Sequence, residues 1–211
     1  MSTVVNLPII TADAPAVQRS PEWFDDRRGK FTGSQFPTLM SGQETEGYKG
    51  YIREKAWERL TGKTVQSFTN EAMLHGINTE PQARSYYEFV ADAEVVEVGF
   101  IVHADFPYVG VSPDGLVGDK GMIEIKCPQP KTHIEYLAAK KLPAKYRWQV
   151  QGQLWVANRE WADFVSFHPD CEHQLIVRVE ASMKDWDALK ERAEIANDAV
   201  EALIKQIKEE A

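Results

Sequence analysis

The stretch Ser112–Cys127, SPDGLVGDKGMIEIKC, contains two short apolar runs with a turn between them. The second run, MIEIK, has the composition of a β-strand. Glu124 and Lys126 are two residues apart in this strand, so their side chains leave the same face of the sheet. Ile123 and Ile125 face the other side. The stretch therefore predicts a β-hairpin with one apolar face and one face that holds a carboxylate beside an ammonium group.

The position of Asp114 depends on the length of the turn in this hairpin. With an even-length turn, Asp114 would pair with Ile125 and lie on the apolar face, because opposed residues share a face. We therefore expect an odd-length turn, a β-bulge or a bend at Pro113 that brings Asp114 beside Glu124. Two carboxylates and a lysine would then form a site for a hard cation. A surface hairpin with its charges facing solvent is the alternative.

The composition limits the class of protein. The chain has 211 residues, of which 43% are hydrophobic, so it can bury the core of one domain. We expect an extended or poorly ordered arm over residues 1–19 and a single domain over 20–211. No run approaches the ~18 apolar residues of a membrane span and no signal peptide is evident, so we expect a cytoplasmic protein without membrane contacts. Cys127 and Cys171 provide neither a disulfide framework nor a zinc motif.

The net charge of −8 would disfavour a nucleic-acid partner if the charge were evenly spread. From Lys126 to Arg147, however, there are six basic residues and a single acid, Glu135. A second basic group lies within residues 27–30. These clusters could form a local surface for a phosphodiester backbone, and a solvated helix face is the alternative.

The remaining sequence predicts a mixed α/β chain. Ser20 and Pro21 are typical of a helix start, and Ser34 is a candidate cap for the next helix. Helices are expected over 21–27, 35–40, 51–60, 70–87 with a break near 78–81, 132–140, 143–158 and from 183 to the C-terminus. Strands are expected over 94–102, 108–111, 161–168 and 174–179. The apolar stripe of the long C-terminal helix packs either on the chain's own core or on a second subunit.

Two polar residues on mostly apolar stripes are further candidates for the site. Glu80 lies at the irregularity that Pro81 introduces, and a carboxylate there must be paired, bound to a metal or reached by water. Gln151 lies between Trp148 and Trp155, where it could reach the hairpin or act as a buried hydrogen-bonding residue. The five histidines lack zinc-ligand spacing, and no nucleophile elbow or phosphate-binding loop is found. The carboxylates and the lysine suit metal-assisted phosphodiester cleavage.

Four blocks of sequence carry a resemblance to a known family. They are Trp23-x3-Arg27-x-Gly29-x2-Thr32-x-Ser34, Gly76-x3-Glu80-x2-Ala83, Ser112-Pro113-Asp114-Gly115 with Glu124-Ile125-Lys126-Cys127-Pro128, and Gln149-Val150-Gln151-Gly152-Gln153. In this order, over about residues 20–170, they resemble the YqaJ-like viral recombinase or lambda exonuclease family of the PD-(D/E)XK nuclease class. The resemblance implies a PD-(D/E)XK nuclease-like core, in which a central mixed β-sheet is flanked by helices.

The resemblance also implies roles for individual residues. Asp114, Glu124 and the backbone carbonyl of Ile125 would bind a catalytic Mg²⁺ ion, and Glu80 would serve a second ion, with Mn²⁺ as a substitute. Lys126 would position or deprotonate the attacking water, and Gln151 would support this centre. Arg27, Ser34 and Ser112 would bind the terminal 5′-phosphate. Lys131, Thr132, Arg147 and Gln149 are candidate DNA contacts, and Thr132 stands where the family has a basic residue.

The function that the resemblance implies is a processive, Mg²⁺-dependent 5′→3′ exonuclease. It would degrade one strand of linear double-stranded DNA from 5′-phosphorylated ends, in phage-type recombination by single-strand annealing. A homotrimeric ring around the DNA, a single-strand annealing protein as partner, and a phage or prophage origin in a bacterial host are also implied. A structure-specific endonuclease or resolvase of the same fold, and a non-catalytic DNA-end-binding module, are the alternatives.

Overall fold

The β-strands form two sheets in the part of the chain that the computed structural model describes, residues 18–65 and 71–210. The smaller sheet has the order β1-β4-β3, with β1 Phe31–Thr32, β4 Val109–Val111 and β3 Ile101–Val102. The larger sheet has the order β2-β5-β6-β7-β8, with β2 Val95–Val96, β5 Gly115–Val117, β6 Gly121–Lys126, β7 Trp161–Ser166 and β8 Leu175–Glu180. The β6–β7 pair is parallel and the other pairs of the larger sheet are antiparallel, so the predicted mixed sheet is confirmed.

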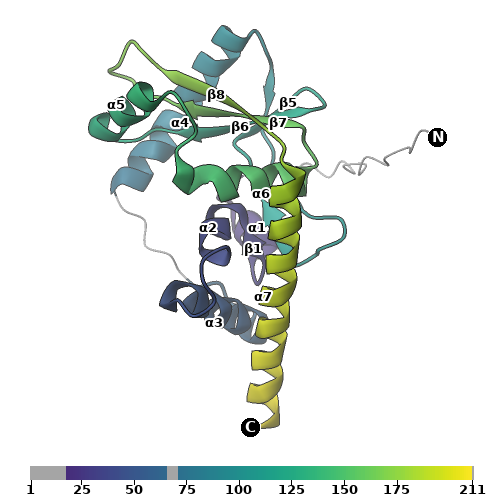
Figure 1. The fold of residues 1–211 in the computed structure, drawn as a ribbon. Helices are drawn as coiled ribbons and strands as arrows, with labels where there is room; N and C mark the ends of the chain where they lie inside the picture. The colour runs from purple at the N-terminus through teal and green to yellow at the C-terminus, as the bar shows by residue number, and fades with distance from the viewer. Residues whose placement is uncertain (1–17, 66–70, 211) are drawn as a thin grey trace, which may run out of the picture.

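The helices surround the larger sheet and extend to one side of it (Figure 1). They are α1 Pro21–Arg27, α2 Phe36–Leu39, α3 Glu46–Thr61, α4 Glu71–Ala91, α5 Pro130–Ala139, α6 Arg147–Ala157 and α7 Met183–Glu209, with 3-10 turns η1 Gly33–Gln35 and η2 Ala144–Tyr146. No helix among the described residues is long and apolar enough to cross a membrane.

The helix start predicted at Ser20 is confirmed, and the cap predicted at Ser34 is wrong. The Ser20 side chain accepts the Trp23 N–H at the start of α1, and the Ser182 side chain accepts the Asp185 N–H at the start of α7. Gly62 ends α3 with a positive φ of 65°, a conformation that glycine adopts without strain. Ser34 caps no helix, because it lies inside η1.

Each face of the larger sheet is covered by a helix that carries site residues. Ala83 and Tyr87 of α4 are buried against the Ile123 and Ile125 side of β6. On the other side, α6 packs on Met122 of β6 and on neighbouring strands. The Glu124 face of β6 is therefore covered as well, and the solvent-facing hairpin is wrong.

The turn between β5 and β6 has three residues, 118–120. Val117 pairs with Gly121 and Gly115 pairs with Ile123, so the next position in register places Asp114 opposite Glu124. The Asp114 N–H donates to the Ile123 carbonyl at 3.2 Å, which extends the ladder to this position. The expected odd-length turn is therefore confirmed.

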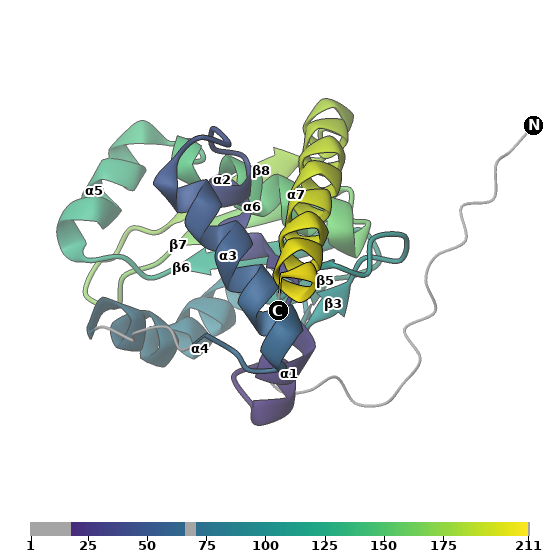
Figure 2. The same ribbon diagram turned by 90° about the horizontal axis from the view of Figure 1, so that it is seen from below.

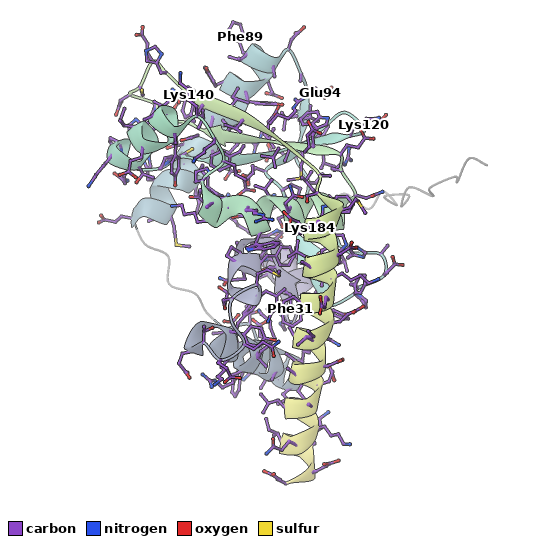
Figure 3. All side chains as sticks on the ribbon, viewed as in Figure 1. Phe31, Phe89, Glu94, Lys120, Lys140 and Lys184 are labelled. Carbon is purple, nitrogen blue, oxygen red and sulfur yellow. The ribbon has the colours of Figure 1, made fainter. Side chains whose placement is uncertain are left out.

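A separate core joins the smaller sheet to α2, α3 and α7. Figure 2 shows α3 beside α7, and Figure 3 labels Phe31, which is fully buried in this core. Leu189, Ala193 and Val200 of α7 are also fully buried here. The stripe of the C-terminal helix thus packs on the chain's own core, as one of the two alternatives predicted.

Three segments differ from the sequence-based expectation. The helix around Pro81 does not restart there, because α4 continues through it from Glu71 to Ala91. Packing of Ala83 and Tyr87 against the sheet offsets the backbone hydrogen bond that a proline lacks. Helix α3 starts at Glu46, within the expected loop, with Thr45 as its cap. The strand expected over 94–102 is reduced to β2 and β3. Residues 1–17 of the predicted arm lie outside the described residues, and the domain boundary stays a prediction.

Candidate active site

Side chains from separate parts of the chain meet at a cavity of about 580 Å³. Glu80 of α4, Asp114 before β5, and Ile125 and Lys126 of β6 line it, and Ser34 of η1 does as well. Glu124 lies behind Lys126 and is only 1% exposed. The structure therefore brings together the three predicted carboxylates and the predicted lysine.

Glu124 is held on all sides by protein donors. Its Oε1 pairs with the Lys126 ammonium and accepts from the Gln149 amide. Its Oε2 accepts from Gln153 Nε2 at 2.7 Å. Gln149 and Gln153 are four residues apart on α6, so they share one helix face. Helix α6 thus fixes the orientation of a buried carboxylate on the neighbouring strand.

Asp114 is crowded by like charges. Its Oδ2 accepts the Ile125 N–H at 2.6 Å. Burial raises the pKa of Asp114 well above its usual value, and the nearby charges of Glu124 and Glu80 raise it further, against the opposing effect of Lys126. The chain therefore holds more negative charge here than its own lysine compensates, and a bound cation would relieve that repulsion.

Lys126 is protonated in this arrangement. Burial alone would lower the pKa of its ammonium, but the charges of Glu124 and Asp114 and the hydrogen bond to Glu124 raise that pKa above the usual value. An ammonium in this state donates hydrogen bonds and cannot accept a proton. Of the two roles that the resemblance implies, positioning fits this geometry better than deprotonation.

Two arginines hold Glu80. Arg19 Nη2 lies 3.0 Å from Glu80 Oε2, and Arg84 Nη2 lies 3.0 Å from Glu80 Oε1. Arg84 also pairs with Glu97 at 2.7 Å and donates to the Asp114 carbonyl at 3.3 Å. Glu80 and Asp114 are therefore linked through Arg84.

The residues fit a hard divalent cation by their chemistry. No three acidic, histidine or cysteine side chains in the described ranges are oriented so as to hold a metal ion. The reason is that Glu124 and Glu80 direct their oxygens at ammonium, amide and guanidinium groups of the chain. Three carboxylates and a backbone segment around one cavity still form the oxygen-rich set that Mg²⁺ prefers.

A second group of polar side chains is assembled by Trp23. The Trp23 Nε1 donates to Ser112 Oγ at 2.8 Å, and the Arg27 guanidinium lies 4.1 Å from the Trp23 ring centroid. Burial lowers the pKa of Arg27, and the charges of Tyr51 and Glu58 offset part of this effect. A partly desolvated guanidinium beside a serine hydroxyl suits a phosphate dianion.

Comparison with known proteins agrees with this geometry. The model of the YqaJ-like viral recombinase domain matches residues 22–160 of the chain. The chain belongs to this family. An alkaline exonuclease from Laribacter hongkongensis has a similar solved structure, with a TM-score of 0.85 and 34% identity over 90% of this chain and 97% of that one. The same exonuclease has also been solved in complex with dAMP.

Two further proteins are similar to this chain at lower identity. A phage-related exonuclease from Haemophilus somnus shares the fold, with a TM-score of 0.69 and 17% identity over 84% of this chain and 96% of that one. An uncharacterized protein of Acanthamoeba polyphaga mimivirus is 24% identical over 161 residues, which cover 70% of this chain. This chain spans about 28% of the length of the mimivirus relative.

The YqaJ-like motif on α6 reaches the site through different glutamines from the one expected. Gln151 Nε2 donates to the Glu180 carbonyl at 2.8 Å, and Gln151 Oε1 accepts the Ser182 N–H at 2.9 Å. Gln151 therefore joins β8 to α7 and does not reach Glu124. Gln149, predicted as a DNA contact, and Gln153, which was not predicted, take that place. The i, i+4 spacing of the two glutamines was the available signal.

The other predicted DNA contacts lie outside the cavity. Arg147 makes a two-pronged ion pair with Asp185 of α7, at 2.9 and 2.6 Å, so its guanidinium is engaged within the chain. Lys131 and Thr132 lie in the first turn of α5, and Lys131 is exposed. Their contact with DNA stays a prediction.

Helix α3 fixes the turn that leads from Arg27 to Ser34, a contact that has no local signal in the sequence. The Gly29 N–H donates to Glu58 Oε2 at 2.8 Å, and Arg59 Nε donates to the Gly29 carbonyl at 2.9 Å. Gly29 has a φ of +71°, and an added Cβ would lie 2.9 Å from the Arg59 side chain. Both backbone groups of the turn are therefore held by α3, and Glu58 is in turn paired with the buried Lys55 at 2.7 Å.

Proposed function

We propose that this chain is a divalent-metal-dependent 5′→3′ exonuclease that processively degrades one strand of linear duplex DNA from 5′-phosphorylated ends. Its role would be phage-type recombination by single-strand annealing. The observation that carries the proposal is the meeting of Glu80, Asp114 and Lys126 at one cavity, with Glu124 buried beside Lys126. Membership of the YqaJ-like family and the structural likeness to an alkaline exonuclease, also solved with a nucleotide, support it.

The chain's own residues prepare the site for hydrolysis. Asp114, Glu124 and the Ile125 carbonyl would hold one Mg²⁺ ion, Glu80 would serve a second, and Mn²⁺ could replace them. When bound, such ions supply a hydroxide nucleophile and stabilise the leaving oxygen. The protonated Lys126 would donate to the scissile phosphate and offset its charge. Gln149 and Gln153 would keep Glu124 in the orientation that a ligand needs.

The direction of degradation would come from the group around Trp23. Arg27 and Ser112, held by Trp23, and Ser34, which lines the cavity, would bind the terminal 5′-phosphate. A guanidinium recognises a phosphate dianion by two hydrogen bonds at once, which a 5′-hydroxyl end cannot match. The enzyme would therefore start at phosphorylated ends.

The assembly we propose is a homotrimeric ring that encloses the DNA and works with a single-strand annealing protein. The net charge of −8 supports a local channel, because most of the surface would repel DNA. A ring would also account for processivity, since an enclosed duplex leaves only at an end or through opening of the ring.

The experiment that tests the function compares three substrates in Mg²⁺ and in chelator. They are linear duplex with 5′-phosphate ends, the same duplex with 5′-hydroxyl ends, and a covalently closed circle. We expect release of mononucleotides from the phosphorylated linear duplex in Mg²⁺ alone. Cleavage of the closed circle would indicate an endonuclease instead, and DNA binding without cleavage would indicate an end-binding module.

The end-binding role is tested by Arg27→Ala, with Arg28→Ala as the matched control. Arg28 is the next residue, but it pairs with the exposed Asp25 and Thr64. Arg27→Ala is expected to reduce the cleavage of phosphorylated ends by about 10²-fold and to leave hydroxyl ends nearly unchanged, because a charge-assisted phosphate contact is lost. An equal loss on both kinds of end would reject the role of Arg27.

A further inference from the structure

Two residues that precede α1 lie at the edge of the candidate active site. Gln18 Nε2 donates to the Val98 and Pro113 carbonyls, both at 2.9 Å. Arg19 follows with a φ of +73°, lines the cavity and places its Nη2 3.0 Å from Glu80 Oε2. Both residues lie outside the stretch matched by the family model, which begins at residue 22.

The ion pair between Arg19 and Glu80 has little structural value. The Arg19 side chain is 43% exposed, and ion pairs with an exposed partner contribute little to stability. A left-handed backbone conformation is also unfavourable for arginine, which has a Cβ. The conformation therefore has an energetic cost, and it places a guanidinium at the edge of a cavity that is also lined by acidic groups.

Glu80 does not depend on Arg19 for compensation of its charge. Arg84 holds the other oxygen of Glu80 and is itself fixed by Glu97 and by the Asp114 carbonyl, with a side chain that is 11% exposed. Arg84 is thus the permanent partner of Glu80. Arg19 is the replaceable one, since its guanidinium bonds to Glu80 through one nitrogen and its side chain is exposed to solvent.

We propose that Arg19 is a DNA-binding residue that Glu80 holds in the free protein and releases to a backbone phosphate of the substrate when Glu80 turns to a divalent cation. This inference rests on the proposed function, because it takes Glu80 as a cation ligand. A guanidinium N–H that donates to a carboxylate oxygen can donate to a phosphate oxygen in the same way. Arg19 would therefore compete with the cation before DNA arrives and bind the DNA afterwards.

Two affinities test this exchange, with Arg19→Gln as the variant and Arg53→Gln as the matched control. Arg53 pairs with Glu46 on the exposed surface of α3, so its replacement removes the same charge from an equivalent ion pair. In calorimetric titrations with Mn²⁺ and no DNA, Arg19→Gln should bind the cation about fivefold more tightly than the wild type, because a competing charge is gone. Arg53→Gln should bind it as the wild type does.

The DNA affinity should change in the opposite direction. With 5′-phosphorylated duplex and Mg²⁺, in a Lys126→Ala background to prevent cleavage, Arg19→Gln should raise the Kd about fivefold to tenfold and reduce the salt dependence by about one phosphate contact. Arg53→Gln should change neither quantity. A double-mutant cycle separates direct competition between Arg19 and the cation for Glu80 from a long-range effect of the Arg19 charge. In a Glu80→Gln background, Arg19→Gln should no longer alter cation affinity.

The outcomes separate this inference from the proposed function. Unchanged or weaker cation binding in Arg19→Gln, an effect that persists in the Glu80→Gln background, or unchanged DNA affinity would each overturn the role of Arg19. If the wild type degrades phosphorylated duplex and Arg19→Gln behaves as Arg53→Gln does, the nuclease proposal stands and the proposed role of Arg19 is rejected. A wild-type protein that binds Mn²⁺ and shows the exchange without degrading DNA would reject the nuclease proposal alone.

Discussion

The chain places a lysine–glutamate pair in each of two different settings. On β6, Lys126 pairs with Glu124, and their side chains are 27% and 1% exposed. On α3, Lys55 pairs with Glu58 at 2.7 Å, and their side chains are 6% and 3% exposed. The two pairs have the same chemistry and similar burial of the carboxylate, but the first lies at a cavity and the second lies against the turn at Gly29.

The difference lies in the charges around each pair. Glu58 also accepts the Gly29 and Val65 N–H groups, and Lys55 also pairs with Glu54 at 2.8 Å. Beside the β6 pair, burial raises the pKa of Asp114, and the charges of Glu124 and Glu80 raise it further. Acidic groups that crowd one another beside a cavity, rather than a buried ion pair as such, therefore distinguish a candidate catalytic site from a structural one.

The largest expected effect that separates the pairs is that of Lys126→Ala. It should lower single-turnover cleavage of 5′-phosphorylated duplex by about 10³-fold, because the donor to the scissile phosphate is lost. DNA binding, measured by fluorescence anisotropy, should change little. The melting temperature should also change little, since Glu124, left without its ammonium partner, can bind a cation. Cleavage at the wild-type rate would remove Lys126 from the site.

Lys55→Ala should give the opposite pattern. It leaves Glu58 buried without its counter-charge, which costs about 3–5 kcal/mol of unfolding free energy. Urea denaturation followed by tryptophan fluorescence measures this cost. The cleavage rate per folded molecule at low temperature should stay within about threefold of the wild type, as expected for changes away from the chemistry. A stable variant with a thousandfold loss of cleavage would show that the two pairs do not differ as described.

Gln153→Ala and Gln151→Ala test which of these two glutamines of α6 belongs to the site. Gln153→Ala removes a donor to Glu124 and should reduce cleavage by about 10–100-fold, as loss of groups that orient a metal ligand does. Gln151→Ala removes two hydrogen bonds at the start of α7 and should cost about 1–3 kcal/mol of stability with little effect on cleavage per folded molecule. The reverse pattern, in which Gln151→Ala loses cleavage and Gln153→Ala loses stability, would show that Gln151 belongs to the catalytic centre.

The smallest expected effect is a gain in stability from Asp114→Asn. Asparagine can still accept the Ile125 N–H, while a charge repelled by Glu124 and Glu80 is removed. In chelator, the variant should be more stable than the wild type by about 1 kcal/mol, although its cleavage is lost with a metal ligand. Thermal unfolding with and without Mg²⁺ measures both effects. Destabilisation in chelator would show that the acidic charge on β6 is already compensated.

Much of the hairpin was predictable because the alternation of residues on a strand is a local property. The positions of Glu124, Lys126 and Ile125 followed from period two, and an odd-length turn was one of the three arrangements expected to bring Asp114 to Glu124. Four residues, 118–121, separate the apolar runs in the sequence, and only the structure shows that Gly121 already belongs to the second strand.

The parts that the sequence did not predict depend on contacts between distant segments. Which face of α6 meets β6 decides between Gln151 and the pair Gln149 and Gln153, and the helical period is equally compatible with both. Arg147 meets Asp185, 38 residues later. Arg19 lies in a segment without periodicity, so its contact with Glu80, 61 residues away, had no local signal.

The three-residue turn at 118–120 also restricts how the chain can vary in length. Insertion or deletion of one residue there would move Asp114 from the position opposite Glu124 to one that faces the apolar side of β6, since the side chains of a strand alternate. Two inserted residues would restore the original parity. Homologues that keep the activity should therefore differ in the length of this turn by even numbers of residues, whatever the identity of those residues.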